Sequence, residues 1–471
     1  MKLHKKIAIL LLLFCFYSCK KLIDVSPPVG TVNSSQVFST DDQAESAMSG
    51  VYYQMITVSQ NFSNYGMTLF AGISADELVL FNQSNAANSQ FQQNNLISTN
   101  NVIAATFWQD PYKTIYLTNA IISGLTGNSN VHDKVKNELI GEAKFIRAYC
   151  NFYLVNLFGD IPLVTSINWR NTNLSPRSPV TAVYASIISD LQDAQTLLPS
   201  DYSAGGGQRI IPNKFAAAAM LARVYLYLGN WQKAADLATQ IINNSNLFSL
   251  SEDPNQVFLT TSNEAIWQLA QSNTISSLNA TPEGYQFVPR SSTSQPLVYL
   301  TSQLLNAFEP NDLRKMAWIN STTYAGKIYY YPYKYKTGPA QASATASYTE
   351  YYMVLRLAEQ FLIRAEAEAN GADGGLSAAI SDLNIIRNRA SLPDYSGPST
   401  AKTAVLDAIY HENQIEFFAE WGHRWLDLKR TNQATTILQP LKPHWTSASE
   451  LYPIPLGDLK TDPNLTQNPG Y

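Results

Sequence analysis

The chain has 471 residues, which is enough for one large domain or for two or three smaller ones. Its formal net charge is −4 and 14% of its residues are charged, a composition that argues against a nucleic-acid partner. Aromatic residues make up 11% of the chain, with 27 tyrosines and 8 tryptophans, and we expect some of these rings to face a ligand or a partner.

The N-terminus has the features of a bacterial lipoprotein signal. Three lysines lie among the first six residues, and residues 7–17 form an apolar run that is too short to span a bilayer. The run ends at Ser18 and Cys19, a small residue before a cysteine, which resembles a lipoprotein cleavage site. We interpret residues 1–18 as a signal peptide, Cys19 as the lipidated residue and residues 19–40 as a tether to the membrane.

Helical periodicity recurs in pairs along the chain. In residues 212–243, small residues at helical spacing and a turn at Gly229 are typical of a tetratricopeptide unit, and residues 355–392 repeat the pattern. Residues 41–122 and 140–198 look like degenerate versions. Such units bury their apolar faces only by stacking on one another. The predicted fold class is therefore mostly α, with tetratricopeptide-like helix pairs forming a scaffold.

A neutral tract interrupts the first helical region. Residues 78–109 contain no charged side chain, and residues 82–101 are dense in Asn, Gln and Ser. A tract of this kind is either a flexible loop or a surface that hydrogen-bonds an uncharged ligand, because long loops in compact domains are often functional. The sequence leaves both interpretations open.

The middle of the chain differs from the helical regions in composition and in residue pattern. Residues 265–269 and 327–336 have the pattern of β-strands, within a segment otherwise rich in loops and aromatic rings. We predict a loop-rich lobe with short strands over residues 248–351. It separates an N-terminal helical region, residues 41–247, from a C-terminal one, residues 352–471.

No catalytic, metal-binding or cofactor motif is present in the sequence. The five histidines are scattered, and there is no nucleophile elbow, phosphate loop or dinucleotide fingerprint. We therefore predict no catalytic residue, no metal site and no cofactor. A carboxylate pair for glycoside hydrolysis needs no sequence motif, so that alternative stays open.

Aromatic rings and polar side chains in the loops suit a sugar ligand instead. A pyranose packs its C–H faces on aromatic rings, and its hydroxyl groups need amide, carboxylate or arginine partners. For each single candidate, a buried loop anchor or an ordinary surface residue is the commoner interpretation. The candidate ligand-binding residues are Asp76, Phe81, Asn82, Phe91, Asn95, Tyr285, Arg290, Trp318 and Tyr324.

The stretch 411–430 is both acidic and aromatic. Glu412, Glu416 and Glu420 recur every four residues, which predicts one helix with the three carboxylates along one face. Bulky rings between them predict burial, so we expect ion pairs that are satisfied inside a core. The alternative is an acid/base pair of an active site.

The same stretch carries a family resemblance. Glu412, Glu416, Phe417, Glu420, Gly422, Arg424, Trp425, Asp427, Leu428 and Arg430 match the C-terminal pattern of the SusD/RagB family. The resemblance continues in Pro453-Ile454-Pro455 and in the final Asn-Pro-Gly-Tyr at 468–471. Together with the start at Cys19 and motifs around Gly141 and Gly159, it extends from Cys19 to Tyr471.

The resemblance implies a fold, a location and a role. Members of the family are outer-membrane lipoproteins of Bacteroidota that face outward, with four tetratricopeptide-like helix pairs and a second lobe. They form a lid on a SusC-like TonB-dependent transporter, and they bind an oligosaccharide or another nutrient without catalysis. Their ligand residues follow no fixed motif, so the candidate residues above rest on chemistry alone.

Four hypotheses follow from this reading. The first is capture of a glycan for uptake through the transporter. The second is the same lid with a peptide or another non-sugar ligand, the third is a surface glycoside hydrolase, and the fourth is a repeat scaffold without a small ligand.

Overall fold

The computed structural model describes residues 37–57 and 60–471. The predicted signal peptide, Cys19 and most of the predicted tether lie outside these residues. Within them, no helix is both long enough and apolar enough to cross a membrane.

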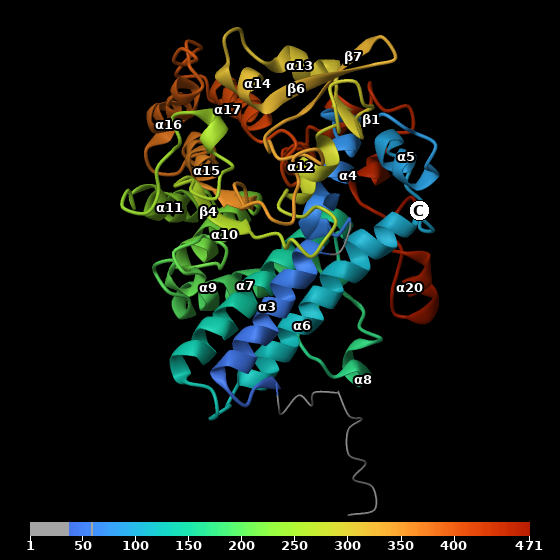
Figure 1. Cartoon of the computed structure of the whole chain (residues 1–471), viewed down its shortest axis with the longest axis vertical. Helices are drawn as coiled ribbons and strands as arrows, with labels where there is room; N and C mark the ends of the chain where they lie inside the picture. The colour runs from blue at the N-terminus through green and yellow to red at the C-terminus, as the bar shows by residue number, and fades with distance from the viewer. Residues whose placement is uncertain (1–36, 58–59) are drawn as a thin grey trace, which may run out of the picture.

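The described chain is mostly helical, as predicted (Figure 1). The α-helices are α3 (Asp41–Thr57), α4 (Met67–Ser74), α5 (Ala86–Gln93), α6 (Asp110–Leu125), α7 (Asp133–Phe158), α8 (Trp169–Thr172), α9 (Val180–Leu197), α10 (Lys214–Tyr227), α11 (Trp231–Ile242), α12 (Pro282–Phe287), α13 (Ser302–Ala307), α14 (Leu313–Trp318), α15 (Leu357–Ala369), α16 (Gly375–Arg389), α17 (Lys402–Glu416), α18 (His423–Arg430), α19 (Ala434–Leu438) and α20 (Leu456–Thr461). Short π-helical segments precede α4 and α6, at Phe62–Gly66 and Ile103–Gln109.

The helices pack as the four predicted pairs. α3 packs on α6, α7 on α9, α10 on α11, and α15 on α16. Contacts of α6 with α7, α9 with α10 and α11 with α15 join the pairs into one continuous stack. The stack climbs from α3 to α16 along one side of the molecule in Figure 1. The last step, from α11 to α15, brings together helices that are separated in sequence by the whole middle lobe.

Small residues permit the close packing of these helices. The alanines at 216–219 of α10 are all buried, and a Cβ atom added at Gly141 of α7 would lie 3.0 Å from Leu198. Gly229 makes the turn between α10 and α11 with a φ of +65°. Arg223 of α10 donates to both carboxylate oxygens of Glu359 on α15, at 2.5 and 2.8 Å. Cys150 of α7 is fully buried.

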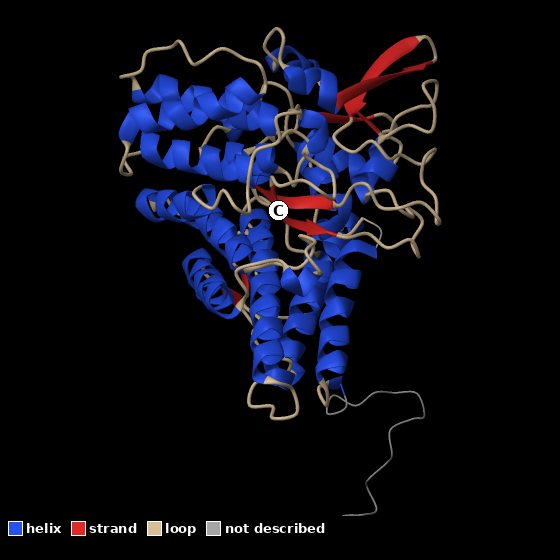
Figure 2. Ribbon diagram, turned by 60° about the vertical axis from the view of Figure 1, so that its left-hand side comes forward, coloured by secondary structure: helices blue, strands red, loops and turns tan. Residues whose placement is uncertain are grey.

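The strands of the described residues form four antiparallel two-stranded pairs, and Figure 2 colours strands red. They are β1 (Leu78–Leu80) with β5 (Val298–Leu300), β2 (Ile161–Pro162) with β3 (Arg177–Ser178), β4 (Ala265–Leu269) with β8 (Tyr352–Arg356), and β6 (Ile319–Tyr324) with β7 (Lys327–Pro332). The strand predicted at 265–269 is β4, whereas the one predicted at 327–336 ends at Pro332 in β7. The β1–β5 and β4–β8 pairs tie the middle lobe to both helical regions, and the domain boundaries drawn from the sequence stay predictions.

The neutral tract is folded, and it uses many of its amides internally. The Asn85 side chain accepts from the backbone N–H of Asn88 at 3.1 Å and so caps α5. Asn94 ends this helix in the left-handed region, with a φ of 51°. Asn100 donates to the carbonyl of Ala87 at 2.9 Å. Part of the tract is therefore a small structured unit beside β1 (Figure 1).

The prediction of one helix over 411–430 is wrong. α17 ends at Glu416 and α18 begins at His423. Between them, Ala419, Trp421 and Gly422 have φ angles of 49°, 48° and 70°, which an α-helix does not permit. A Cβ atom added at Gly422 would lie 2.6 Å from Ala71 of α4, so close packing against α4 favours glycine at this turn.

Candidate ligand-binding groove

A groove opens where the neutral tract meets the middle lobe. Its volume is about 470 Å³, and it contains three of the predicted ligand-binding residues, Asn82, Tyr285 and Arg290. These residues come from segments about two hundred positions apart in the sequence. The full lining consists of Leu80, Asn82, Asn88, Tyr285, Gln286, Val288, Pro289, Arg290, Ser294, Gln295, Pro296, Leu297 and Pro339.

The β1–β5 pair brings the two walls of the groove together. Leu80 at the end of β1 pairs with Val298 at the start of β5. The backbone N–H of Phe81 then donates to the carbonyl of Leu297 at 3.1 Å. Because the pair is antiparallel, Asn82 after β1 and residues 294–297 before β5 lie at the same end.

Helix α12 presents Tyr285 and Gln286 to the groove. Thr281 caps this helix by accepting from the backbone N–H of Gly284 at 3.0 Å. A Cβ atom added at Gly284 would lie 2.6 Å from the carbonyl oxygen of Thr337, so a side chain would push α12 out of place. Burial raises the pKa of Glu283 on the same helix to about 8, and its carboxyl oxygen accepts from the hydroxyl of Tyr352 at 2.7 Å.

The walls of the groove offer hydrogen-bonding groups that the described chain leaves unused. The side chains of Asn88, Gln286 and Gln295 have no hydrogen-bond partner within residues 37–57 and 60–471. The Asn82 oxygen accepts from the backbone N–H of Ser84 at 2.9 Å. An amide both donates and accepts, which matches the hydroxyl rim of a sugar.

An aromatic patch adjoins the groove. We define it as Phe81, Tyr299, Tyr324 and Tyr329, all of which are half-buried. The ring centroid of Phe81 lies 5.4 Å from that of Tyr324 and 5.2 Å from that of Tyr329, and Tyr299 lies 5.2 Å from Tyr329. Two of these rings were predicted as ligand residues. Of the other two, Tyr329 belongs to the strand pattern predicted at 327–336, and Tyr299 lies in the loop-rich segment predicted at 248–351.

Three predicted residues lie away from any exposed surface. Asp76 is 5% exposed, and its two carboxylate oxygens accept from Arg424 at 2.8 and 2.9 Å. Phe91 is fully buried against Phe70, with ring centroids 4.7 Å apart. Trp318 is also fully buried, and its indole N–H donates to the carbonyl of Pro254 at 2.9 Å. These side chains have no free face for a ligand, so we leave them out of the proposed site.

The last predicted residue, Asn95, is exposed but lies elsewhere. It lines a depression beside His444 and Tyr471. The groove therefore brings together some of the predicted residues and separates others. It also adds Asn88, Gln286 and Gln295, whose only signal in the sequence was an amide in or near a loop.

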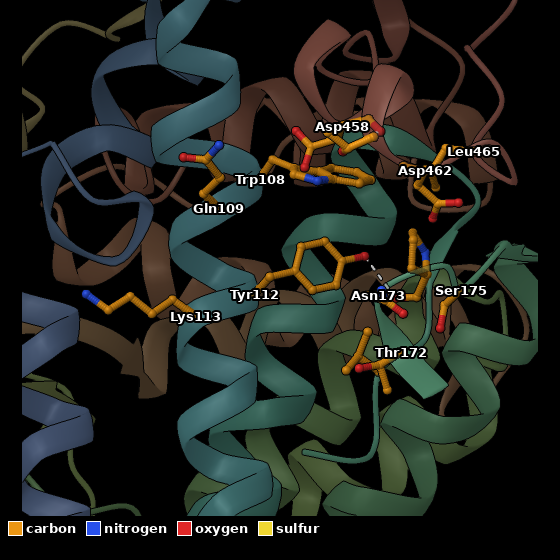
Figure 3. Close-up of a pocket in the computed structure, with 13 residues that line it drawn as sticks. Trp108, Gln109, Tyr112, Lys113, Thr172, Asn173, Ser175, Asp458, Asp462 and Leu465 are labelled. Atoms are coloured by element: carbon orange, nitrogen blue, oxygen red, sulfur yellow. Dashed lines mark hydrogen bonds between the residues drawn. The ribbon is translucent and has the colours of Figure 1, made fainter. Parts of the chain in front are cut away.

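A second depression, of about 390 Å³, lies between α6, α8 and α20 (Figure 3). Figure 3 shows the Tyr112 ring pointing towards Asn173 and the Trp108 ring beside Asp458. Both rings are held by the protein. The Tyr112 hydroxyl donates to the carbonyl of Pro162 at 2.8 Å, and Trp108 is 4% exposed, with its ring centroid 4.9 Å from that of Phe158. None of the predicted ligand residues lines this depression, so the groove is the stronger candidate.

Comparisons with known proteins agree with the fold. A family model described as "Starch-binding associating with outer membrane" matches residues 32–226, and one described as "SusD family" matches residues 313–471. SusD-like protein P2 of Formosa agariphila is 27% identical over 516 aligned positions, which cover 99% of each chain. The chain belongs to the SusD/RagB family.

Solved structures of SusD superfamily proteins have the same fold. A SusD superfamily protein from Bacteroides vulgatus superimposes with a TM-score of 0.79 at 24% identity, covering 92% of this chain and 99% of that one. A structure described as a laminarin binding SusD-like protein superimposes with a TM-score of 0.77 at 24% identity, covering 91% and 99%.

The segment matched by the SusD family model contains most of a buried ion-pair network. Arg314 donates to Glu412 at 2.5 Å and to Glu416 at 2.9 Å, and Arg356 donates to Glu420 at 2.9 Å. Although burial opposes ionisation, Arg389, Arg356 and Arg314 hold the pKa of Glu416 well below its ordinary value. The three glutamates of the 411–430 stretch are thus paired inside the core, as expected, and none is exposed for acid/base chemistry.

The two family models leave residues 227–312 unmatched. This segment supplies Tyr285, Arg290 and seven further residues of the groove lining. The two family models therefore cover most of the helical scaffold and most of the buried ion-pair network, whereas most of the groove lining lies between them.

Proposed function

We propose that this SusD/RagB protein binds a glycan in the groove and passes it to a TonB-dependent outer-membrane transporter. The observation that carries the proposal is a group of amides beside Tyr285 and next to the aromatic patch, from Asn88, Gln286 and Gln295, which have no hydrogen-bond partner in the described part of the chain. A sugar presents C–H faces to rings and hydroxyl groups to amides, so this combination fits a saccharide.

Two comparisons support a glycan as the ligand. One matching family model is described as starch-binding, and one structural neighbour is described as binding laminarin. In support of binding without catalysis, no aspartate or glutamate lines the groove, whereas glycoside hydrolysis uses a pair of carboxylates.

The binding site can be tested by calorimetric titration of the chain that begins at residue 20, which lacks the predicted lipid. Oligosaccharides and a peptide digest serve as titrants. We expect heat with a glycan, and we expect Tyr285→Ala to weaken that binding about 5- to 30-fold, because a truncated central aromatic removes about 1–2 kcal/mol.

Asn95→Ala is the matched control, since Asn95 is an exposed amide residue outside the groove. It should bind as the wild type does. If only the peptide digest gives heat, the ligand is a peptide and not a glycan. Unchanged glycan affinity in Tyr285→Ala would remove the groove from the proposal.

We also propose that lipid on Cys19 anchors the protein to the outer membrane beside its transporter. The family description places its members at the outer membrane, and the N-terminal sequence fits a lipoprotein signal. Cys19→Ala should move the protein out of the membrane fraction. An affinity-tagged wild-type protein, extracted in detergent, should copurify with a large β-barrel transporter; recovery of the protein alone would count against that partner.

A further inference from the structure

We propose that the glycan is anionic, with a carboxylate or sulfate group on its sugar rings, and that Arg290 binds this group. The inference rests on the proposed function, because it names the substrate class of the same groove. It follows from three observations: the charges in the lining, the lack of an internal partner for Arg290, and the fixed loop that carries it.

The groove has a positive lining in a chain with a net charge of −4. Arg290 is the only charged residue among its lining residues, and no Asp, Glu or Lys is present there. The second depression differs, since Asp458, Asp462 and Lys113 all line it. The local charge of the groove therefore favours an anion, although the chain as a whole does not.

Arg290 also differs from every other arginine of the chain. All 13 arginines lie in the described part of the chain. Nine of them form ion pairs: Arg147, Arg223, Arg314, Arg356, Arg364, Arg387, Arg389, Arg424 and Arg430. Arg177 and Arg209 donate to backbone carbonyls, and Arg170 lies over the Trp169 ring.

Only Arg290 makes no ion pair, side-chain hydrogen bond or ring contact within residues 37–57 and 60–471. Its side chain is exposed at the groove. A chain that uses its guanidinium groups so consistently for internal contacts leaves this one free where the candidate ligand would lie.

The loop that carries Arg290 is held against the β6–β7 hairpin. The backbone N–H of Thr323 donates to the carbonyl of Ser292 at 2.8 Å, and the Thr322 hydroxyl donates to the carbonyl of Ser294 at 2.7 Å. Because these hydrogen bonds hold the backbone of the loop in place, Arg290 loses less entropy on binding a ligand. Its planar guanidinium can donate two parallel hydrogen bonds to a carboxylate or a sulfate, a geometry that a hydroxyl group cannot match.

The test is calorimetric titration of the chain from residue 20 with three probes. Oligogalacturonate carries carboxylates, a κ-carrageenan oligosaccharide carries sulfates, and a laminarin oligosaccharide is neutral. We expect an acidic probe to bind at least about 10-fold more tightly than laminarin, as one hydrogen-bonded charge at an exposed site allows. Binding of oligogalacturonate would identify a carboxylate as the recognised group, and binding of the carrageenan oligosaccharide would identify a sulfate.

Arg290→Gln should remove that preference by lowering the affinity for the acidic probes to about that for laminarin, and Arg290→Lys should retain part of it. Arg170→Gln is the matched control, because Arg170 is an exposed arginine without an ion pair on α8, at the other end of the molecule from the groove (Figure 1). It removes the same charge from the whole chain and should bind as the wild type does. The preference should also fall as salt is raised.

The possible failures are distinguishable. If laminarin binds as tightly as the acidic probes, or if Arg290→Gln keeps an acidic preference, the anionic inference is overturned while glycan binding in the groove stands. If no saccharide gives heat, the proposed glycan function itself fails. If Tyr285→Ala binds as the wild type does, the groove is not the glycan site, and the anionic inference fails with it.

Discussion

Glu416 is the residue whose removal should most disturb the scaffold. Its side chain is fully buried, and one carboxylate oxygen accepts from Arg314 at 2.9 Å while the other accepts from Arg356 and Arg389. Glu416→Gln keeps the shape and removes the charge, so three arginines lose a shared counterion. Removing one partner of a buried ion pair costs about 3–5 kcal/mol, and three contacts on one carboxylate place this change at the upper end of that range.

The free energy of unfolding can be measured by urea denaturation followed by tryptophan fluorescence. Glu252→Gln is the matched control, because Glu252 is exposed, and it should change the free energy of unfolding by less than about 0.5 kcal/mol. A loss below about 1 kcal/mol in Glu416→Gln would refute the reasoning, since it would mean that water or a rearranged neighbour replaces the missing charge.

The pH dependence gives a second readout of the same residue. The folded pKa of Glu416 lies well below the ordinary value of 4.5, so its stabilising contribution is complete above about pH 4.5 and is lost as the pH falls towards the folded pKa. The difference in unfolding free energy between the wild type and Glu416→Gln should therefore shrink in acid. A constant difference from pH 7 to pH 3 would contradict the assignment of a low pKa.

Two further predictions concern buried groups outside the groove. Trp318→Ala should lower the free energy of unfolding by about 3–5 kcal/mol, because it leaves a cavity where the fully buried indole lay. The protein that remains folded should bind the glycan with unchanged affinity. A loss of glycan affinity without a loss of stability would mean that Trp318 belongs to the site. Burial raises the pKa of Glu142 to about 8, and the Tyr52 hydroxyl donates to its carboxyl at 2.6 Å. The contribution of Glu142 to the free energy of unfolding is therefore complete below pH 4.5 and is lost as the pH rises towards 8. Glu142→Gln should flatten the fall in stability between about pH 5 and pH 8, as measured by thermal unfolding across that range, and an unchanged slope would exclude Glu142 as its source.

Local patterns were enough to predict the scaffold. The pairs predicted at 212–243 and 355–392 from small residues at helical spacing are α10 with α11 and α15 with α16. The same periodicity failed over 411–430, where Glu412, Glu416 and Glu420 keep their spacing but the backbone leaves the helix after Glu416. The packing of Gly422 against α4 overrides the local preference there, and no residue within 411–430 signals that contact.

Asp76 and Trp318 illustrate why the candidate site was harder to predict. Both residue types are common in sugar sites, yet each side chain already has a hydrogen-bond partner from a distant part of the chain. Asp76 accepts from Arg424, and Trp318 donates to the carbonyl of Pro254. Asn82 and Tyr285 had no stronger signal in the sequence, and they meet because β1 pairs with β5.

The sequence by itself determined the helix pairs, the family and the kinds of side chain available for a ligand, because periodicity and motifs are properties of neighbouring residues. Only the tertiary structure decided which of those side chains are free. Whether Arg290 or Arg424 can bind a ligand depends on the presence of a partner such as Asp76, and that partner comes from a segment hundreds of residues away.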